Sequence, residues 1–485
     1  MTDATDPRRV GLRAALRRHW PIAAVLALAV LARAVVAIAY APALMFPDSW
    51  SYIGAAYGPS HLGGVRPPGY ALTMFALEQA TGPSLGVVTA LQHVAGLGIG
   101  VVIYALLLRL GTGRLIATLA AAVVLLDGYA IALEQHILAE TFTTAAMVAS
   151  IALLITARSA PGLALAGLLL AVAVLMRTPT IFVVPLWLAY LVYRHRPARA
   201  WLAPVLALAG TLAAFLAVNQ AQTGRSGLTN ADGWFLYGRT AALADCARFT
   251  PPAGTEALCE PAGHPERPPI FYVWSPESPA QRLYGRVGAP GSDDDLRAFA
   301  LATLRSRPLA FAQRVAEDLV RYADPSAETP GGSDGAITLP EHPRTMPGWL
   351  DTEARDRYVP GYEPEVAAPA GLARAYAGVV RFPRPLLVAL VALPPVALVL
   401  LWRRGRRGRL AEIALLSGSG VVLIAGATLT SAFVVRYMVP ALPLLVAGAA
   451  LAAAELAALR RPAAGAPDGA AARPPAADPM PLRSP

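Results

Sequence analysis

The run PIAAVLALAVLARAVVAIAY, from Pro21 to Tyr40, decides the fold class of this chain. It is uninterrupted by charge except at Arg33. An α-helix needs about 20 mainly apolar residues to cross the hydrocarbon core of a bilayer, so this run predicts a spanning helix. A basic stretch from Arg8 to His19 precedes the run, and no small-residue cleavage site closes it. We therefore expect a retained first helix and not a removable signal peptide.

Apolar runs of this kind recur along most of the 485 residues. The chain is 55% hydrophobic and only 15% charged, whereas a soluble domain averages about 25% charged residues. We predict an all-α polytopic membrane protein with about ten transmembrane helices. The predicted spans are residues 21–42, 84–108, 115–131, 138–156, 161–176, 179–193, 200–219, 386–402, 410–429 and 434–457.

Arginine is concentrated in short segments between these runs. The positive-inside rule places such segments in the cytoplasm. It predicts a multi-pass protein of the cell membrane with both termini in the cytoplasm. The formal charge of +10 therefore indicates topology, and nucleic acid is not an expected partner. The main clusters lie at residues 8–18, 109–114, 194–199, 403–409 and 460–461.

The predicted spans divide the chain into five parts. Two of them lie outside the cell in this topology: a first outer loop and a domain of mixed structure large enough to fold on its own. The parts are a cytoplasmic N-terminus (1–20), an N-terminal transmembrane module (21–219) with its first outer loop at 43–83, an extracytoplasmic domain (220–385), C-terminal transmembrane helices (386–457) and a disordered cytoplasmic tail (458–485).

The two outer segments contain further local signals. Residues 68–80 are apolar but too short to cross a bilayer, so we expect a helix at the interface. In the extracytoplasmic domain, Ser292 is expected to cap one helix and Pro308 to begin another. The two cysteines of the chain, Cys246 and Cys259, both lie in this domain. Outside the cell a disulfide between them is expected, with two free thiols as the alternative.

Three arginines lie at the predicted outer ends of helices, against the positive-inside trend: Arg66, Arg177 and Arg436. Arginine in such places suggests a local anion, and the phosphate of a lipid headgroup matches its planar fork. The alternative is ordinary pairing with carboxylates at the same ends. Those carboxylates are Asp48, Glu78, Asp127, Glu134 and Glu140.

Five short motifs follow one another at these outer ends: FPDSWSY at 46–52, RPPGY at 66–70, HILAETF at 136–142, LMRTPT at 175–180 and RYMVPALPLL at 436–445. Together they resemble the GT-C glycosyltransferases. The resemblance is to the polyprenyl-phosphate-sugar-dependent, family 39-like group, which includes the protein O-mannosyltransferases and the lipid A aminoarabinose transferase. It covers residues 20–220 and 386–457, whereas 220–385 resembles no domain that we can name.

The resemblance implies an enzyme, a hexosyl- or pentosyltransferase of the cell envelope. Its donor would be a sugar on a polyprenyl phosphate, and its acceptor a hydroxyl of a glycan, lipid or protein on the extracytoplasmic face, with inversion at the sugar. Asp48 matches the acid of the first loop and is the expected general base. Arg66, Arg436 and Arg177 are expected at the donor phosphate. Site-lining roles are expected for Tyr52, Glu140 and Tyr437.

One departure from the family concerns a metal ion. Many members have two adjacent acids in the first loop, but here Ser49 follows Asp48. A single carboxylate is a poor cage for a divalent cation. No organic cofactor is expected, and a divalent metal ion stays an open alternative.

Simpler roles compete with each assignment. Asp48 and Glu140 could instead cap helix ends. The arginines could anchor helices at the membrane interface or pair with carboxylates, and the tyrosines could belong to an aromatic belt. At the level of function, two alternatives are a transporter or flippase of a lipid-linked saccharide and a non-catalytic membrane scaffold. A transporter usually has a repeat and a polar path through the bilayer, and the sequence indicates neither.

Overall fold

The computed structural model describes residues 7–58, 64–194, 198–260, 267–329, 359–363 and 365–459, together with residues 337, 339–341 and 356. Over these residues the chain is built of helices and loops and contains no β-strand. One isolated bridge joins Leu44 to His136. The predicted all-α fold is confirmed. Residues 460–485 of the predicted tail lie outside the described residues.

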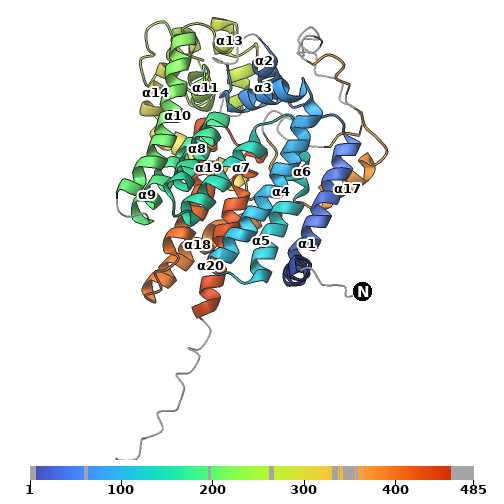
Figure 1. The fold of residues 1–485 in the computed structure, drawn as a ribbon. Helices are drawn as coiled ribbons and strands as arrows, with labels where there is room; N and C mark the ends of the chain where they lie inside the picture. Colours follow the sequence, from blue (N-terminus) through green and yellow to red (C-terminus); the bar gives the residue numbers. More distant parts are fainter. Residues whose placement is uncertain are drawn as a thin grey trace, which may run out of the picture.

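The first half of the chain forms most of the long helices in Figure 1. Its elements are α1 (Pro7–Ala39), α2 (Ser49–Tyr57), α3 (Gly69–Thr81), α4 (Leu85–Arg109), α5 (Arg114–Leu126), α6 (Gly128–Glu134), α7 (Glu140–Thr156), α8 (Ala160–Met176), η1 (Thr178–Val183), α9 (Val184–Arg194) and α10 (Arg199–Thr223).

The second half begins with short helices and returns to long ones. Its described elements are α11 (Asp232–Ala241), η2 (Glu256–Leu258), α12 (Pro269–Trp274), α13 (Pro279–Tyr284), α14 (Ser292–Ser306), α15 (Pro308–Arg321), α17 (Ala370–Val379), α18 (Leu386–Arg403), α19 (Leu410–Thr430), η4 (Val435–Met438) and α20 (Leu442–Leu459). Helices α11, α13 and α14 lie at one end of the bundle, which we call the upper end (Figure 1, top).

Among the described residues, six helices are long and apolar enough to cross a bilayer: α1 from Arg18 onward, α4, α10 from Ala200 onward, α18, α19 and α20. Helices α5 and α6 form a bent pair that counts as a seventh candidate, with an angle of 49° between them. Shorter apolar helices are α7, α8 and the joined η1 and α9. All these segments coincide with predicted spans, so the multi-pass architecture follows the predicted order.

The bend between α5 and α6 is made at Asp127, whose backbone is extended with ψ of 110°. Its carboxylate accepts N–H groups of Tyr129 (3.4 Å) and Phe382 (3.1 Å). The next residue, Gly128, donates its N–H to the carbonyl of Val380 at 2.6 Å. Backbone groups released by the break are therefore satisfied within the protein, as buried backbone groups must be.

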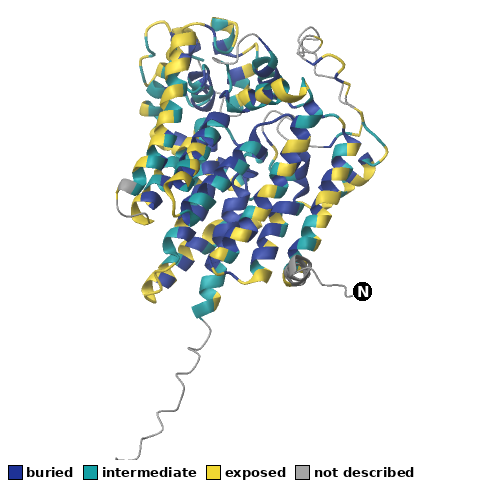
Figure 2. Cartoon of the chain, in the orientation of Figure 1, coloured by how far each residue is buried: buried dark blue, intermediate teal, exposed yellow. Residues whose placement is uncertain are grey.

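Each peripheral helix has one exposed face and one buried face. Figure 2 shows the exposed faces on the outside of the bundle and the buried faces within it. On α1 the exposed side chains include Leu28, Leu31 and Ile38. Only 17% of the apolar window of α10 and 22% of that of α18 is buried. Large apolar surfaces of this kind are unfavourable in water and suit contact with lipid chains.

The first loop folds as α2 and α3 at the upper end. The predicted short helix at 68–80 is present as α3, which packs against α2, α4 and α8. Tyr70 and Met74 of α3 are fully buried. These contacts fix the loop on the bundle.

The described part of 220–385 consists of short helices and loops. Trp234, Tyr237 and Phe299 form the centre of its own small core. Cys246 and Cys259 are joined by a disulfide with Cα atoms 6.0 Å apart. As predicted, a helix begins at Pro308, namely α15.

The expected cap at Ser292 is wrong. Gly291, with φ of 77°, is the N-cap of α14, and Ser292 is the first helical residue. The Ser292 hydroxyl instead accepts the indole N–H of Trp234 at 2.8 Å. Packing against α11 therefore determines its role.

Candidate active site

The Asp48 carboxylate bridges two arginines that are distant in the sequence. Its Oδ1 accepts from Arg66 and its Oδ2 from Arg436. Asp48 precedes α2, Arg66 precedes α3, and Arg436 lies in η4 before the last helix. The fold thus brings the first loop and the C-terminal module together at one point.

A second carboxylate extends this cluster. Glu140, the first residue of α7, pairs with Arg177, and its Oε1 lies 3.3 Å from Nη1 of Arg436. The charges therefore alternate in the order Arg66, Asp48, Arg436, Glu140, Arg177. Three guanidinium groups face two carboxylates, so one positive charge stays uncompensated within this charge cluster. A buried cluster with excess positive charge favours an anionic ligand.

Close backbone packing places two of these arginines together. A Cβ on Gly69 would lie 2.7 Å from the carbonyl carbon of Leu175, so only glycine permits this approach of α3 to the end of α8. Arg66 lies three residues before Gly69, and Arg177 two residues after Leu175. The RPPGY and LMRTPT motifs therefore meet through their backbones.

Aromatic rings pack against the cluster. The Arg436 guanidinium lies 4.3 Å from the ring centroid of Phe46, and that of Arg177 lies 4.9 Å from the Tyr437 ring. Tyr52 is buried and packs edge-on against Tyr70, with ring centroids 4.9 Å apart. Such contacts hold the guanidinium planes in fixed orientations.

Asp48 is strongly acidic in this setting. Burial alone favours its neutral form, but the guanidinium charges of Arg436 and Arg66 outweigh burial and lower the pKa of Asp48 to about 2. Burial is also the main reason that the pKa of Tyr52 rises to about 12. At neutral pH the site therefore holds an ionised Asp48 beside a neutral Tyr52.

A cavity of about 300 Å³ opens beside the cluster. Arg66, Arg177, Tyr52 and Tyr437 line it, whereas Asp48, Glu140 and Arg436 do not. Its volume is at the lower end of the range for small-molecule sites in proteins. The remaining lining residues include an apolar group, Met176, Ile181 and Phe182, and a group from 220–385, Thr229, Asp232, Phe235, Leu236 and Arg297.

Within the described residues, three buried guanidinium nitrogens of the cluster make no hydrogen bond, and one of them, Nη1 of Arg436, lies 3.3 Å from the Glu140 carboxylate. The Nε atoms of Arg66 and Arg436 are buried and have no hydrogen-bond acceptor in the structure. A buried N–H without a partner is costly, so such atoms point to an acceptor that arrives with a ligand. Phosphate oxygens are acceptors of the required charge.

A divalent metal does not fit this donor set. In the described part of the chain, no group of three His, Cys, Asp or Glu side chains is close enough to share an ion. Asp48 and Glu140 are each held by guanidinium groups, which compete with a cation for the same oxygens. His136, one helical turn before Glu140 in the sequence, bonds instead to the carbonyl of Ala132.

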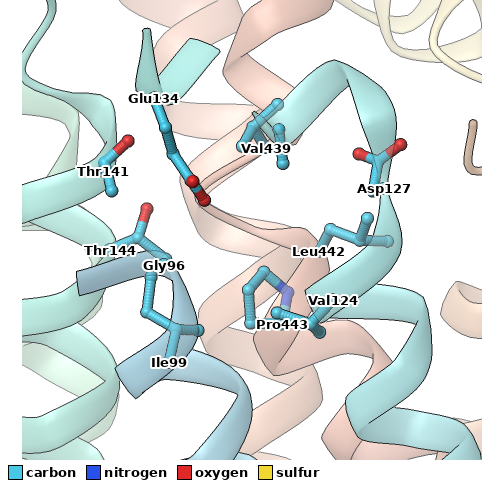
Figure 3. A pocket seen from close by; sticks show the side chains of 11 residues that line it. Gly96, Ile99, Val124, Asp127, Glu134, Thr141, Thr144, Val439, Leu442 and Pro443 are labelled. Carbon is cyan, nitrogen blue, oxygen red and sulfur yellow. The ribbon is translucent and has the colours of Figure 1, made fainter. Parts of the chain in front are cut away.

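The remaining outer acids do not enter the cluster. Glu134 forms a separate buried ion pair with Arg33 across helices, with Arg33 Nε and Nη2 donating at 2.8 and 2.7 Å. His93 contacts the same carboxylate at 2.8 Å. Figure 3 shows Glu134 beside a small cavity, with Thr141 and Thr144 on one side and Leu442 and Pro443 on the other. Arg33 thus pairs with a carboxylate of another helix, which the sequence alone did not predict.

Sequence reasoning missed the contribution of 220–385 to the cavity. The Arg66 guanidinium lies 5.4 Å from the ring centroid of Phe235 in α11. Asp232 and Arg297 also line the cavity. The run DGWFLYGR at 232–239, an acid followed by three aromatic residues, was the available signal.

No family model and no curated protein matches this chain. Among solved structures, the chain is similar to ArnT from Cupriavidus metallidurans, crystallised with bound undecaprenyl phosphate. The TM-score is 0.35 and the sequence identity 12%, over 90% of this chain and 77% of that chain. A likeness of this size assigns no residue and no activity.

Proposed function

We propose that the chain is a membrane glycosyltransferase that moves a sugar from a polyprenyl-phosphate donor to an acceptor hydroxyl. The observation that carries the proposal is the charge cluster itself: a buried, net-positive group of side chains beside a cavity, in a chain of many membrane-spanning helices. Such a site suits a phosphate that is attached to a lipid.

The donor phosphate would bind where Arg66 and Arg177 line the cavity. There it would satisfy the excess positive charge of the cluster and accept from the free Nε atom of Arg66. Arginine is suited to this because its planar fork donates to two oxygens at once. The apolar wall of Met176, Ile181 and Phe182 would meet the adjoining lipid chain.

Asp48 would act as the general base, and the donor would activate it. A carboxylate with a pKa of about 2 is a weak base, because an effective catalytic base has a pKa closer to the working pH. The donor phosphate competes with Asp48 for Arg66 and Arg436. As the arginines turn to the phosphate, the pKa of Asp48 rises, since opposite charges held it down.

The proposed reaction is an inverting displacement at the anomeric carbon. The acceptor oxygen forms a bond to that carbon as the bond from carbon to the phosphate oxygen breaks. The leaving lipid phosphate keeps the electron pair, and its new charge is stabilised by the arginines. The acceptor proton moves to Asp48. The acceptor would be a hydroxyl of the cell envelope, with the upper end of the bundle outside the cell.

Binding of undecaprenyl phosphate to the purified chain in nanodiscs tests the phosphate site. Replacing Arg66 or Arg177 by glutamine should weaken binding by roughly 10- to 100-fold, as expected for one lost charge-assisted hydrogen bond. Arg305, an exposed residue near the end of α14, provides the control: Arg305→Gln should bind like wild type. Equal binding by all variants would remove the donor site.

A further inference from the structure

The cavity beside the charge cluster has a second polar wall, made by residues of α11 and α14. Asp232, Phe235 and Leu236 all line it. Their spacing of three and four residues places them on one face of α11. Thr229 and Arg297 complete this wall, which we call the α11 wall.

Hydrogen bonds hold the α11 wall in place. The Thr229 hydroxyl donates to Oδ1 of Asp232 at 2.7 Å. Asp293, in the first turn of α14, accepts the N–H of Gly233 at 2.7 Å and a guanidinium N–H of Arg297 at 2.7 Å. A Cβ on Gly233 would lie 1.9 Å from the carbonyl oxygen of Asp293, so the two helices touch through their backbones. These contacts join α11 and α14 without a ligand.

The α11 wall adjoins the arginine that faces the proposed phosphate. The ring of Phe235 packs 5.4 Å from the Arg66 guanidinium. In a polyprenyl-phosphate sugar, the anomeric oxygen links the sugar directly to phosphorus. A phosphate held at Arg66 would therefore place its sugar beside Phe235, in the cavity that Asp232 also lines.

We propose that the α11 wall binds the sugar ring of the donor through the hydroxyl groups of that ring. The inference rests on the proposed function. Phe235 would pack against the C–H face of the ring, which is apolar like the aromatic ring itself. Asp232 accepts hydrogen bonds only, and sugar hydroxyls donate them. Arg297 supplies donors to the sugar oxygens.

Lipid binding separates sugar recognition from phosphate recognition. The probes are undecaprenyl phosphate alone and the same lipid carrying glucose, mannose, galactose or arabinose, each titrated against the full-length protein in nanodiscs. Wild type should bind at least one glycosylated lipid more tightly than the unglycosylated lipid. Asp232→Asn and Phe235→Leu should remove that difference, a loss of roughly 10- to 100-fold for the carboxylate. Asp232→Asn should still bind undecaprenyl phosphate like wild type, whereas Phe235→Leu also removes the ring that packs on the Arg66 guanidinium.

Asp294 is the matched control. It is an exposed acid in the same first turn as Asp293 and does not line the cavity. Asp294→Asn should leave the binding of every lipid unchanged. In the transfer reaction, Asp232→Asn should raise KM for the donor and leave KM for the acceptor unchanged, a split that a general folding defect does not produce.

Two results overturn the inference and leave the phosphate site intact. One is wild-type protein that binds no glycosylated lipid better than undecaprenyl phosphate. The other is an Asp232→Asn variant that keeps the full preference for the glycosylated lipid or that changes KM for the acceptor alone. If wild type binds neither kind of lipid, the proposed function itself fails, so the two failures are distinguishable.

Discussion

Asp48 and Arg436 form a largely buried ion pair across 388 residues of sequence. One belongs to the loop after the first helix and the other to the break before the last helix. Neither module has a complete charge cluster alone. The pair therefore makes the site depend on correct docking of the C-terminal helices against the N-terminal module.

Arg436 should matter for stability as well as for activity. Its replacement by glutamine leaves Asp48 with one guanidinium partner. It also removes the positive charge beside the Glu140 carboxylate. Removal of one partner from a buried pair costs about 3–5 kcal/mol. We expect thermal unfolding in detergent to shift down clearly for Arg436→Gln, and only in part for Arg436→Lys, because lysine cannot bridge two carboxylates with a planar fork. An unchanged unfolding temperature in Arg436→Gln would show that the pair does not hold the modules together.

The pH dependence of transfer should differ between free and donor-bound protein. The profile of kcat/KM reports the free enzyme, and that of kcat reports the complex. In the free protein the arginines lower the pKa of Asp48 to about 2, so its charge is lost only in strong acid. In the complex the phosphate competes for the arginines, and the pKa rises. The acid limb of kcat should therefore lie at higher pH than the acid limb of kcat/KM. Coincident limbs would contradict activation of Asp48 by the donor.

The ionised Asp232 carboxylate should lower the free energy of unfolding, although it is expected to bind the sugar. Burial, and then the charge of Asp293, raise the pKa of Asp232 above its usual range. A carboxyl with a raised pKa in the folded state favours folding at pH below its unfolded pKa, and this contribution is lost as pH rises through the folded pKa. At neutral pH the ionised group is therefore unfavourable. We expect Asp232→Asn to unfold at the same or a higher temperature than wild type at pH 7, although it binds the glycosylated donor less well. A lower unfolding temperature would show that the ionised carboxylate stabilises the fold and would contradict this expectation.

The sequence predicted the helical segments because each depends on local composition. Apolar runs such as Pro21–Tyr40 must span or be buried, and their order needs no knowledge of packing. Arg66, Arg436 and Glu140 were identified for a related reason. A charged side chain at the end of an apolar run is energetically unfavourable unless it has a partner. The identity of the partners was left open, because pairing across 388 residues depends on helix packing.

The α11 wall and the role of Ser292 could not be predicted, because both arise from contact between helices. Asp232 lies in a stretch rich in glycine, proline and aromatic residues, and Arg297 lies in the helix predicted after Ser292, but nothing local relates either residue to Arg66. Their position follows from the close approach of α11 and α14 at Gly233. A hydroxyl that looks like a helix cap in the sequence is used instead by the Trp234 indole.

The proposed orientation has its own test. Gln79 is an exposed residue of α3, at the upper end of the bundle. The two native cysteines form a disulfide, so Gln79→Cys introduces a single thiol. A membrane-impermeant maleimide should label this thiol on intact cells without permeabilisation. Labelling that requires broken cells would place the charge cluster on the cytoplasmic side and contradict the proposed topology.

Sugar transfer by Asp48→Asn shows whether Asp48 is the general base. The substitution keeps the shape of the side chain but removes the charge that takes the acceptor proton. We expect the variant to bind undecaprenyl phosphate at least as well as wild type, because a competitor for Arg66 and Arg436 is weakened. Its transfer rate should fall by roughly 10²- to 10⁴-fold, the usual contribution of a general base. Transfer at the wild-type rate would show that Asp48 is not the base and that the charge cluster serves another purpose.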